Sequence, residues 1–175
     1  MPHPLDIFVR CPKCGGNFVE NDFKSKRCTS CGFVYYLNPS AATVAVITDG
    51  KGNILVATRS KEPAKGTYDL PGGFCDCHES AEEGVAREVL EETGLKVTGT
   101  EYMFSIPNIY VYSGMEIHTM DMFFKCVVED TASLRADDDV QELQWLSLED
   151  VDSTMFGLAS IREGIMRLKT ENKKL

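Results

Sequence analysis

The segment from Gly73 to Leu95, GFCDCHESAEEGVAREVLEETGL, decides the fold that we expect for this chain. It predicts a helix over residues 81–93, because Ser80 and the glutamate three residues later match the capping box that begins many helices. Gly94 is the residue type expected where such a helix ends, because glycine adopts the left-handed conformation of a C-terminal cap without steric cost. The segment is therefore expected to form a loop, a capped helix and a turn.

Three glutamates of the expected helix, Glu88, Glu91 and Glu92, fall on one arc of its surface, and Arg87 lies four residues before Glu91, in reach of its carboxylate. On an isolated helix such an arc is most simply a solvated acidic face. Here it borders an apolar arc, and partly buried like charges are costly without a cation among them. Oxygen ligands favour hard cations such as Mg²⁺ or Mn²⁺. The apolar arc consists of Ala81, Val85, Ala86, Val89 and Leu90.

The spacing of these residues resembles the Nudix box at every defining position: Gly73-x5-Glu79-x7-Arg87-Glu88-Val89-x-Glu91-Glu92-x-Gly94-Leu95. The resemblance implies an α+β protein, a Nudix-type α/β/α sandwich with a mixed sheet. It also implies a hydrolase that cleaves a pyrophosphate bond with Mg²⁺ or Mn²⁺ as catalytic cofactor. The metal ligands that it implies are the carbonyl of Gly73 and the carboxylates of Glu88, Glu91 and Glu92, with Glu91 as a further ligand or as the base.

The same resemblance implies roles for three residues outside the metal set. Arg87 would orient the catalytic glutamates, and Glu79 would tie the loop to the helix. Some members of the family use a glutamate from a later loop as general base, and Glu142 is the candidate in this chain. A solvated acidic loop that enters a strand is the simpler interpretation of Glu142.

Four of the seven cysteines form two pairs, Cys11-x-x-Cys14 and Cys28-x-x-Cys31. Four thiolates in two tight turns are typical of a closed, structural Zn²⁺ site, and two disulfides are the alternative. We therefore expect a small zinc ribbon and linker over residues 1–38, followed by a Nudix hydrolase domain over residues 39–175. Cys75, Cys77 and His78 in the box loop are a weaker candidate for a second metal site.

A zinc ribbon ahead of a Nudix domain resembles the layout of the NADH pyrophosphatase group. That group carries a Ser-Gln-Pro-Trp-type motif after the box, where this chain has Ser105-Ile106-Pro107-Asn108. We expect the substrate to be a nucleoside diphosphate linked to another moiety, such as ADP-ribose or NADH. The alternatives are a nucleoside triphosphate pyrophosphohydrolase, a nucleotide-sensing protein without catalysis, or a zinc-ribbon interaction protein.

Three residues are candidates for direct contact with the substrate. Arg59 stands on the strand that precedes the box, where it could reach a phosphate or lie on the surface. Tyr110 and Tyr112 could stack on a base or simply pack against the protein.

The formal net charge of −9 restricts the partners of this chain. Affinity for nucleic acid comes mostly from Lys and Arg on phosphates, so the charge argues against a nucleic-acid partner. No apolar run approaches the roughly 20 residues of a membrane span, and the first ten residues do not resemble a signal peptide. We expect a cytoplasmic protein whose partner is a small-molecule nucleotide. A homodimer is left open.

The rest of the chain is expected to mix strands and helices. Strands are predicted over residues 43–48 and 53–58, paired as a hairpin around a turn at 49–52. Further strands are expected at 67–70, 97–106, 119–128 and 141–146, and a second amphipathic helix over about 157–170.

Overall fold

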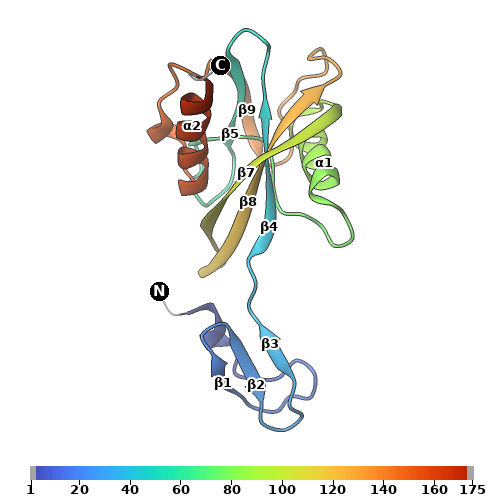
Figure 1. Ribbon diagram of the computed structural model, residues 1–175, viewed down its shortest axis with the longest axis vertical. Coiled ribbons are helices and arrows are strands. Elements are labelled where there is room, and N and C mark those ends of the chain that lie inside the picture. The colour runs from blue at the N-terminus through green and yellow to red at the C-terminus, as the bar shows by residue number, and fades with distance from the viewer. Residues whose placement is uncertain (1–2, 173–175) are drawn as a thin grey trace.

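The computed structural model describes residues 3–172, so the outermost ends of the two expected domains, residues 1–2 and 173–175, lie outside the described residues. A small antiparallel sheet near the N-terminus lies at one end of the molecule (Figure 1). The sheet has the strand order β1-β2-β3, with β1 (Phe18–Asp22), β2 (Ser25–Cys28) and β3 (Val34–Tyr36). The short helix η1 (Pro4–Ile7) precedes the sheet in the chain and contacts β8.

Two three-stranded sheets and two long helices form the larger part of the molecule (Figure 1). The first sheet is mixed, in the order β4-β8-β7, because β8 pairs with β4 in parallel and with β7 in antiparallel. Its strands are β4 (Ser40–Ile47), β7 (Val97–Tyr112) and β8 (Met115–Val128). The second sheet is antiparallel, in the order β6-β5-β9. Its strands are β5 (Asn53–Arg59), β6 (Tyr68–Asp69) and β9 (Val140–Ser147).

Helix α1 (Ala81–Thr93) and helix α2 (Ala159–Asn172), which follows η2 (Ser153–Met155), cover opposite sides of the sheets (Figure 1). The side chains of β4 contribute to the cores on both sides of the sheet, since successive side chains of a strand point to opposite faces. Val44 and Val46 join the core that contains the apolar side chains of α2. Ala45 and Ile47 join the core that contains those of α1. The α/β/α layering expected from the sequence is confirmed.

The expected hairpin of residues 43–48 with 53–58 is wrong. β4 and β5 belong to different sheets, and only an isolated bridge between Thr48 and Ile54 joins their neighbouring ends. Residues Thr43–Ile47 are all buried, and a strand covered on both faces suits a parallel partner inside a layered fold. In the mixed sheet the hairpin is instead β7–β8, which turns at Ser113 and Gly114. Their φ angles of 52° and 76° are both positive, as a type I′ turn of two residues requires.

None of the helices within residues 3–172 is long and apolar enough to cross a membrane.

Candidate functional site

Helix α1 begins and ends as its sequence predicts. The Ser80 side chain accepts a hydrogen bond from the backbone N–H of Glu83 at 3.2 Å, and the Glu83 carboxylate accepts one from the N–H of Ser80 at 2.7 Å. Gly94 caps the C-terminus with φ of 69°. Val85 and Val89 are fully buried, but Leu90 is 53% exposed, so its assignment to the core-facing arc is wrong. Leu90 follows Val89 and is turned about 100° away from it, beyond the edge of the contact with the sheet.

Arg87 is the centre of an ionic network that joins the loop before α1 to two of its glutamates. Its guanidinium donates to both carboxylate oxygens of Glu79 at 3.1 and 2.7 Å and to the carbonyl of Phe74 at 3.1 Å. It also donates to Glu88 at 2.8 Å and to Glu91 at 3.0 Å. One guanidinium therefore fixes three carboxylates, and the Glu79 bonds are the largest cause that raises the pKa of Arg87.

Glu92 lies deeper than the other glutamates and faces a different partner. It is 8% exposed, and its Oε2 accepts a hydrogen bond from the N–H of Gly72 at 3.0 Å. The pKa of Glu92 is raised to about 8, mainly because the carboxyl is buried; the hydrogen bond from the N–H of Gly72 lowers this pKa, and the nearby carboxylates of Asp69 and Glu88 add to the increase. Burial also raises the pKa of Glu88. The protein thus holds two carboxylates where a bound cation would lower their cost.

Gly73 is packed directly against one of these carboxylates. A Cβ atom at Gly73 would lie 2.7 Å from the carboxyl carbon of Glu88, closer than any side chain could be accommodated without displacement. The Gly73 carbonyl accepts a hydrogen bond from the N–H of Thr43 at 2.8 Å, which pins the box loop to β4. A side chain at position 73 would therefore displace the carboxylate of Glu88.

These residues line a cleft of about 380 Å³ that is strongly acidic. Its lining holds two arginines, and both already bind carboxylates: Arg87 as above, and Arg59 through an ion pair with Asp69 at 2.5 Å. An anionic diphosphate could enter such a cleft only together with cations. The eight acidic residues of the lining are Asp69, Asp76, Glu88, Glu91, Glu92, Asp121, Asp138 and Asp139.

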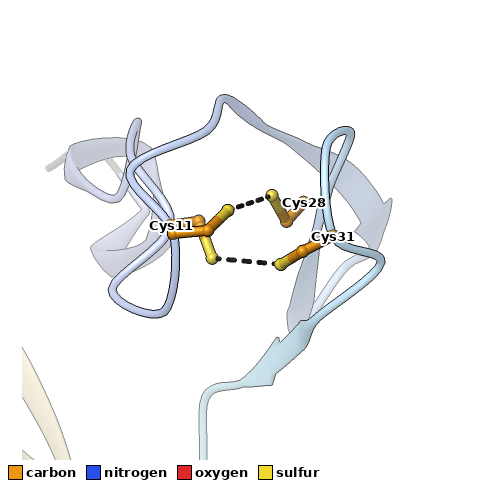
Figure 2. Close-up of side chains that lie close together, drawn as sticks. Cys11, Cys28 and Cys31 are labelled. Carbon is orange, nitrogen blue, oxygen red and sulfur yellow. Dashed lines mark hydrogen bonds between the residues drawn. The ribbon is translucent and has the colours of Figure 1, made fainter.

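The only group of three or more metal-binding side chains in residues 3–172 whose ligand atoms already converge consists of Cys11, Cys14, Cys28 and Cys31. Their ligand atoms all lie within 4.8 Å of one another, and the Cys11–Cys31 and Cys14–Cys28 sulfur pairs are 3.8 and 3.5 Å apart (Figure 2). A tetrahedron with Zn–S bonds of about 2.3 Å has sulfurs about 3.8 Å apart, so the cluster fits Zn²⁺.

The backbone around these cysteines repeats in the two loops. Cys11 and Cys28 each accept, at their carbonyls, a hydrogen bond from the glycine four residues on, Gly15 and Gly32, and both glycines have φ of 73°. Every cysteine described is a free thiol, so the structure does not contain the two alternative disulfides. The four cysteines could hold a metal ion.

The comparisons with known proteins agree with this geometry. The family model of the NUDIX domain matches residues 38–168. The chain belongs to the Nudix family. It is 34% identical over 136 residues to the ADP-ribose pyrophosphatase of Methanocaldococcus jannaschii, an alignment that covers 77% of each chain. It is 29% identical over 143 residues to the NAD-capped RNA hydrolase NudC of Vibrio cholerae, covering 81% of this chain and 50% of that protein.

Solved Nudix structures share the fold. The crystal structure of a NUDIX hydrolase from Nitrosomonas europaea superposes with a TM-score of 0.70 at 20% identity, covering 94% of this chain and 92% of that one. The NUDIX domain of Shewanella oneidensis NrtR, solved with ADP ribose, superposes with a TM-score of 0.58 at 22% identity, covering 78% and 88%. At these identities the likeness shows the fold alone. The chain spans only about half the length of the NudC relative.

Within this Nudix fold, the candidate residues outside the box are not all brought together. Tyr110 lines the cleft, and its hydroxyl accepts a hydrogen bond from Arg59 at 3.2 Å. Arg59 also donates to the carbonyl of Pro63, so little of its guanidinium is free for a phosphate. Tyr112 is 62% exposed and is not among the lining residues. Glu142 is exposed on β9 and is also absent from the lining.

The sequence reasoning missed several polar residues of the cleft, among them Asp138, Asp139, Asn108 and Asp121. Asp138 and Asp139, the two residues immediately before β9, line the cleft. The acidic triplet at 137–139 was a signal for them in the sequence. Asn108 and Asp121 line it from β7 and β8. Their signal in the sequence was weaker. Each is a polar residue on the same face of its strand as buried apolar residues, at a position where a core side chain is expected.

Proposed function

We propose that this protein is a divalent-metal-dependent hydrolase of the pyrophosphate bond in a nucleoside diphosphate linked to another moiety, with ADP-ribose and NADH as the first compounds to test. The observation that carries the proposal is the arrangement of Arg87, Glu88, Glu91 and Glu92 on one wall of an acidic cleft. Such a cleft has no free cation for a diphosphate. The similarity to the ADP-ribose pyrophosphatase of Methanocaldococcus jannaschii supports the substrate class.

The residues fit Mg²⁺ or Mn²⁺ because the box glutamates offer only oxygen ligands beside a glycine carbonyl. Glu88, Glu91, Glu92 and the Gly73 carbonyl would hold the ions. When bound, the ions neutralise the diphosphate and lower the pKa of a coordinated water.

The chain's own groups prepare this site. Arg87 orients Glu88 and Glu91 through direct hydrogen bonds, and Glu79 in turn holds the guanidinium of Arg87 from the loop side. The N–H of Gly72 orients the carboxylate of Glu92. Asp138 and Asp139 bring further carboxylates to the cleft, and they are better placed than Glu142 to accept a proton from a nucleophilic water there.

We further propose that the cysteine cluster binds one structural Zn²⁺ and that residues 1–38 form a zinc ribbon and linker separate from a catalytic domain over residues 39–175. The apolar core of the small sheet supports this division. It contains only Cys11, Phe18 and Cys28 as buried members, with Phe8, Phe33 and Tyr35 packed against them. So small a core depends on its metal for stability.

The test is a screen of the purified protein with Mg²⁺ or Mn²⁺ against ADP-ribose, NADH, nucleoside diphosphate sugars and nucleoside triphosphates, with products identified. A nucleoside monophosphate together with a phosphorylated partner is the expected result. Inorganic pyrophosphate released from a triphosphate would assign the alternative activity instead. Turnover of ADP-ribose at full rate after removal of all free divalent ions would contradict the proposed mechanism.

A further inference from the structure

One end of the cleft is lined by polar side chains where the fold would otherwise place its apolar core. Along β8, Thr119, Asp121 and Phe123 point to the same side of the sheet, because they alternate, and all three are buried. Phe123 belongs to the core beneath α2. Asp121 and Thr119 are each 4% exposed, and they line the cleft. The inner face of this strand thus changes from apolar to polar where it reaches the cleft.

The neighbouring strand changes in the same way at the same level. Asn108 of β7 is opposite Thr119 in the register of the two strands, and Ile106 is opposite Asp121. Ile106 is part of the apolar core, whereas Asn108 lines the cleft. Buried polar groups are costly and are retained where they have a partner.

Asp121 has partners within the protein, but none of them is a cation. Its Oδ1 accepts a hydrogen bond from the Thr119 hydroxyl at 2.6 Å and its Oδ2 accepts one from the Ser160 hydroxyl of α2 at 2.5 Å. Each carboxylate oxygen has a second lone pair, so both can accept another hydrogen bond. An acceptor of this kind, in a cleft already rich in carboxylates, repels phosphate and attracts neutral hydroxyl or amino groups.

Asn108 has no partner for its amide. It is 8% exposed, yet its side chain makes no hydrogen bond with the residues that the structure describes. No fully buried side-chain N or O atom in that part of the chain lacks a partner, so the amide atoms of Asn108 are not sealed off and reach the cleft. The amide offers two donors and an acceptor to whatever enters.

We propose that Asn108, Asp121 and Thr119 form the subsite for the uncharged part of the substrate, and that it recognises hydroxyl or amino groups of the sugar or base attached to the diphosphate. This inference rests on the function proposed above. β4 lies between the box loop and β8: Ala42 pairs with Phe74 on one side and with Asp121 on the other. Adjacent strands are about 4.8 Å apart, so Asp121 and Thr119 on β8 lie about 10 Å from the box loop, and Asn108 on β7 lies about 14 Å from it. A group linked directly to a bound diphosphate can span this separation.

Asn108→Leu tests the inference, because leucine keeps the size of the side chain and removes its hydrogen bonds. Calorimetric titrations with Mn²⁺ would measure the binding of AMP, ribose 5-phosphate and inorganic pyrophosphate. We expect the variant to bind AMP about tenfold or more weakly, with inorganic pyrophosphate unchanged. Equal losses for AMP and ribose 5-phosphate assign the contact to the sugar, and a loss for AMP alone assigns it to the base.

The unfolding temperature separates recognition from a structural role. Because the amide faces the cleft and makes no hydrogen bond within the described residues, we expect Asn108→Leu to leave the stability of the free protein unchanged or to raise it. His118→Leu is the matched control, since His118 is the exposed neighbour of Thr119 on the opposite face of β8. Asp121→Asn provides a second variant and is expected to weaken AMP or ribose 5-phosphate several-fold, again without effect on inorganic pyrophosphate.

Two results would overturn the subsite: unchanged AMP and ribose 5-phosphate binding in both variants, or an equal loss of inorganic pyrophosphate binding. Kinetics with ADP-ribose add a separate check, in which Asn108→Leu raises KM about tenfold and leaves kcat within about twofold. Failure of the wild-type protein to hydrolyse any nucleotide would refute the proposed function, while the titrations would still decide whether the subsite exists.

Discussion

Replacement of Glu92 by glutamine is expected to stabilise the protein at pH 8 in the absence of divalent ions and to remove most of its hydrolytic activity. Burial raises the pKa of Glu92 from 4.5 to about 8. A carboxyl with a raised pKa in the folded state contributes stability that is fully present below pH 4.5 and is lost as the pH rises towards 8. Each pH unit of that interval is worth about 1.4 kcal/mol, so the loss has an upper limit of roughly 5 kcal/mol.

Glutamine keeps the shape of Glu92 and the oxygen that accepts the hydrogen bond of Gly72, but it carries no charge. The variant is therefore expected to lose much of the decline in stability between pH 5 and pH 8. Urea unfolding after dialysis into metal-free buffer measures this directly. The single tryptophan, Trp145, packs against the core beneath α1 and reports the transition by fluorescence. With Mg²⁺ present, turnover is expected to fall about a hundredfold or more, because a ligand charge has been removed.

Glu101→Gln is the matched control, because Glu101 is exposed and forms no ion pair within the described residues. It should leave both the pH dependence and the turnover unchanged. The reasoning is refuted if Glu92→Gln keeps the wild-type decline in stability with pH, or if it hydrolyses the substrate at a near-normal rate with unchanged metal dependence.

Three further predictions follow from the geometry. Elemental analysis should find about one zinc per chain, and Cys28→Ser should lower that zinc content. The variant should also increase amide exchange over residues 8–33 while α1 stays folded. Loss of protection from exchange in α1 as well would contradict the separation of ribbon and catalytic domain. Arg87→Lys should lower kcat about a hundredfold, because the three donors of an ammonium group cannot replace the five hydrogen bonds of the guanidinium, and circular dichroism should show an intact fold. Asp139→Asn, in the cleft, should lower kcat more than Glu142→Gln on the exposed face of β9; the opposite order would return the general-base role to Glu142.

The sequence determined the local structure of α1 because its signals are local. Ser80, Glu83 and Gly94 lie within a turn of the helix ends that they cap, so their positions alone fix where the helix begins and ends. The two cysteine pairs are equally local, since each is held by its own tight turn. The spacing of Arg87 and Glu91 also predicted their ion pair, which forms at 3.0 Å.

Tertiary structure decided which groups meet from distant parts of the chain. The local sequence of β4 does not show whether the strand pairs with its neighbour in the chain or with β8. In the structure β4 pairs with β8, and both of its faces are covered inside the layered fold. That pairing brings Asp121 beside Ala42 and so carries Asp121 into the cleft.

The same limit applies to the deep position of Glu92 and to Arg59. Helical spacing places Glu92 near Glu88, but its contact with Gly72, 20 residues earlier, and the burial that raises its pKa both come from tertiary packing. The sequence left Arg59 as a candidate for a phosphate contact or for the surface, and the structure pairs it with Asp69. Residue types and short-range spacing thus determined the family, the box helix and the cysteine turns. Burial and long-range contacts, which depend on how the layers pack, raised the pKa of Glu88 and Glu92 and decided the composition of the cleft.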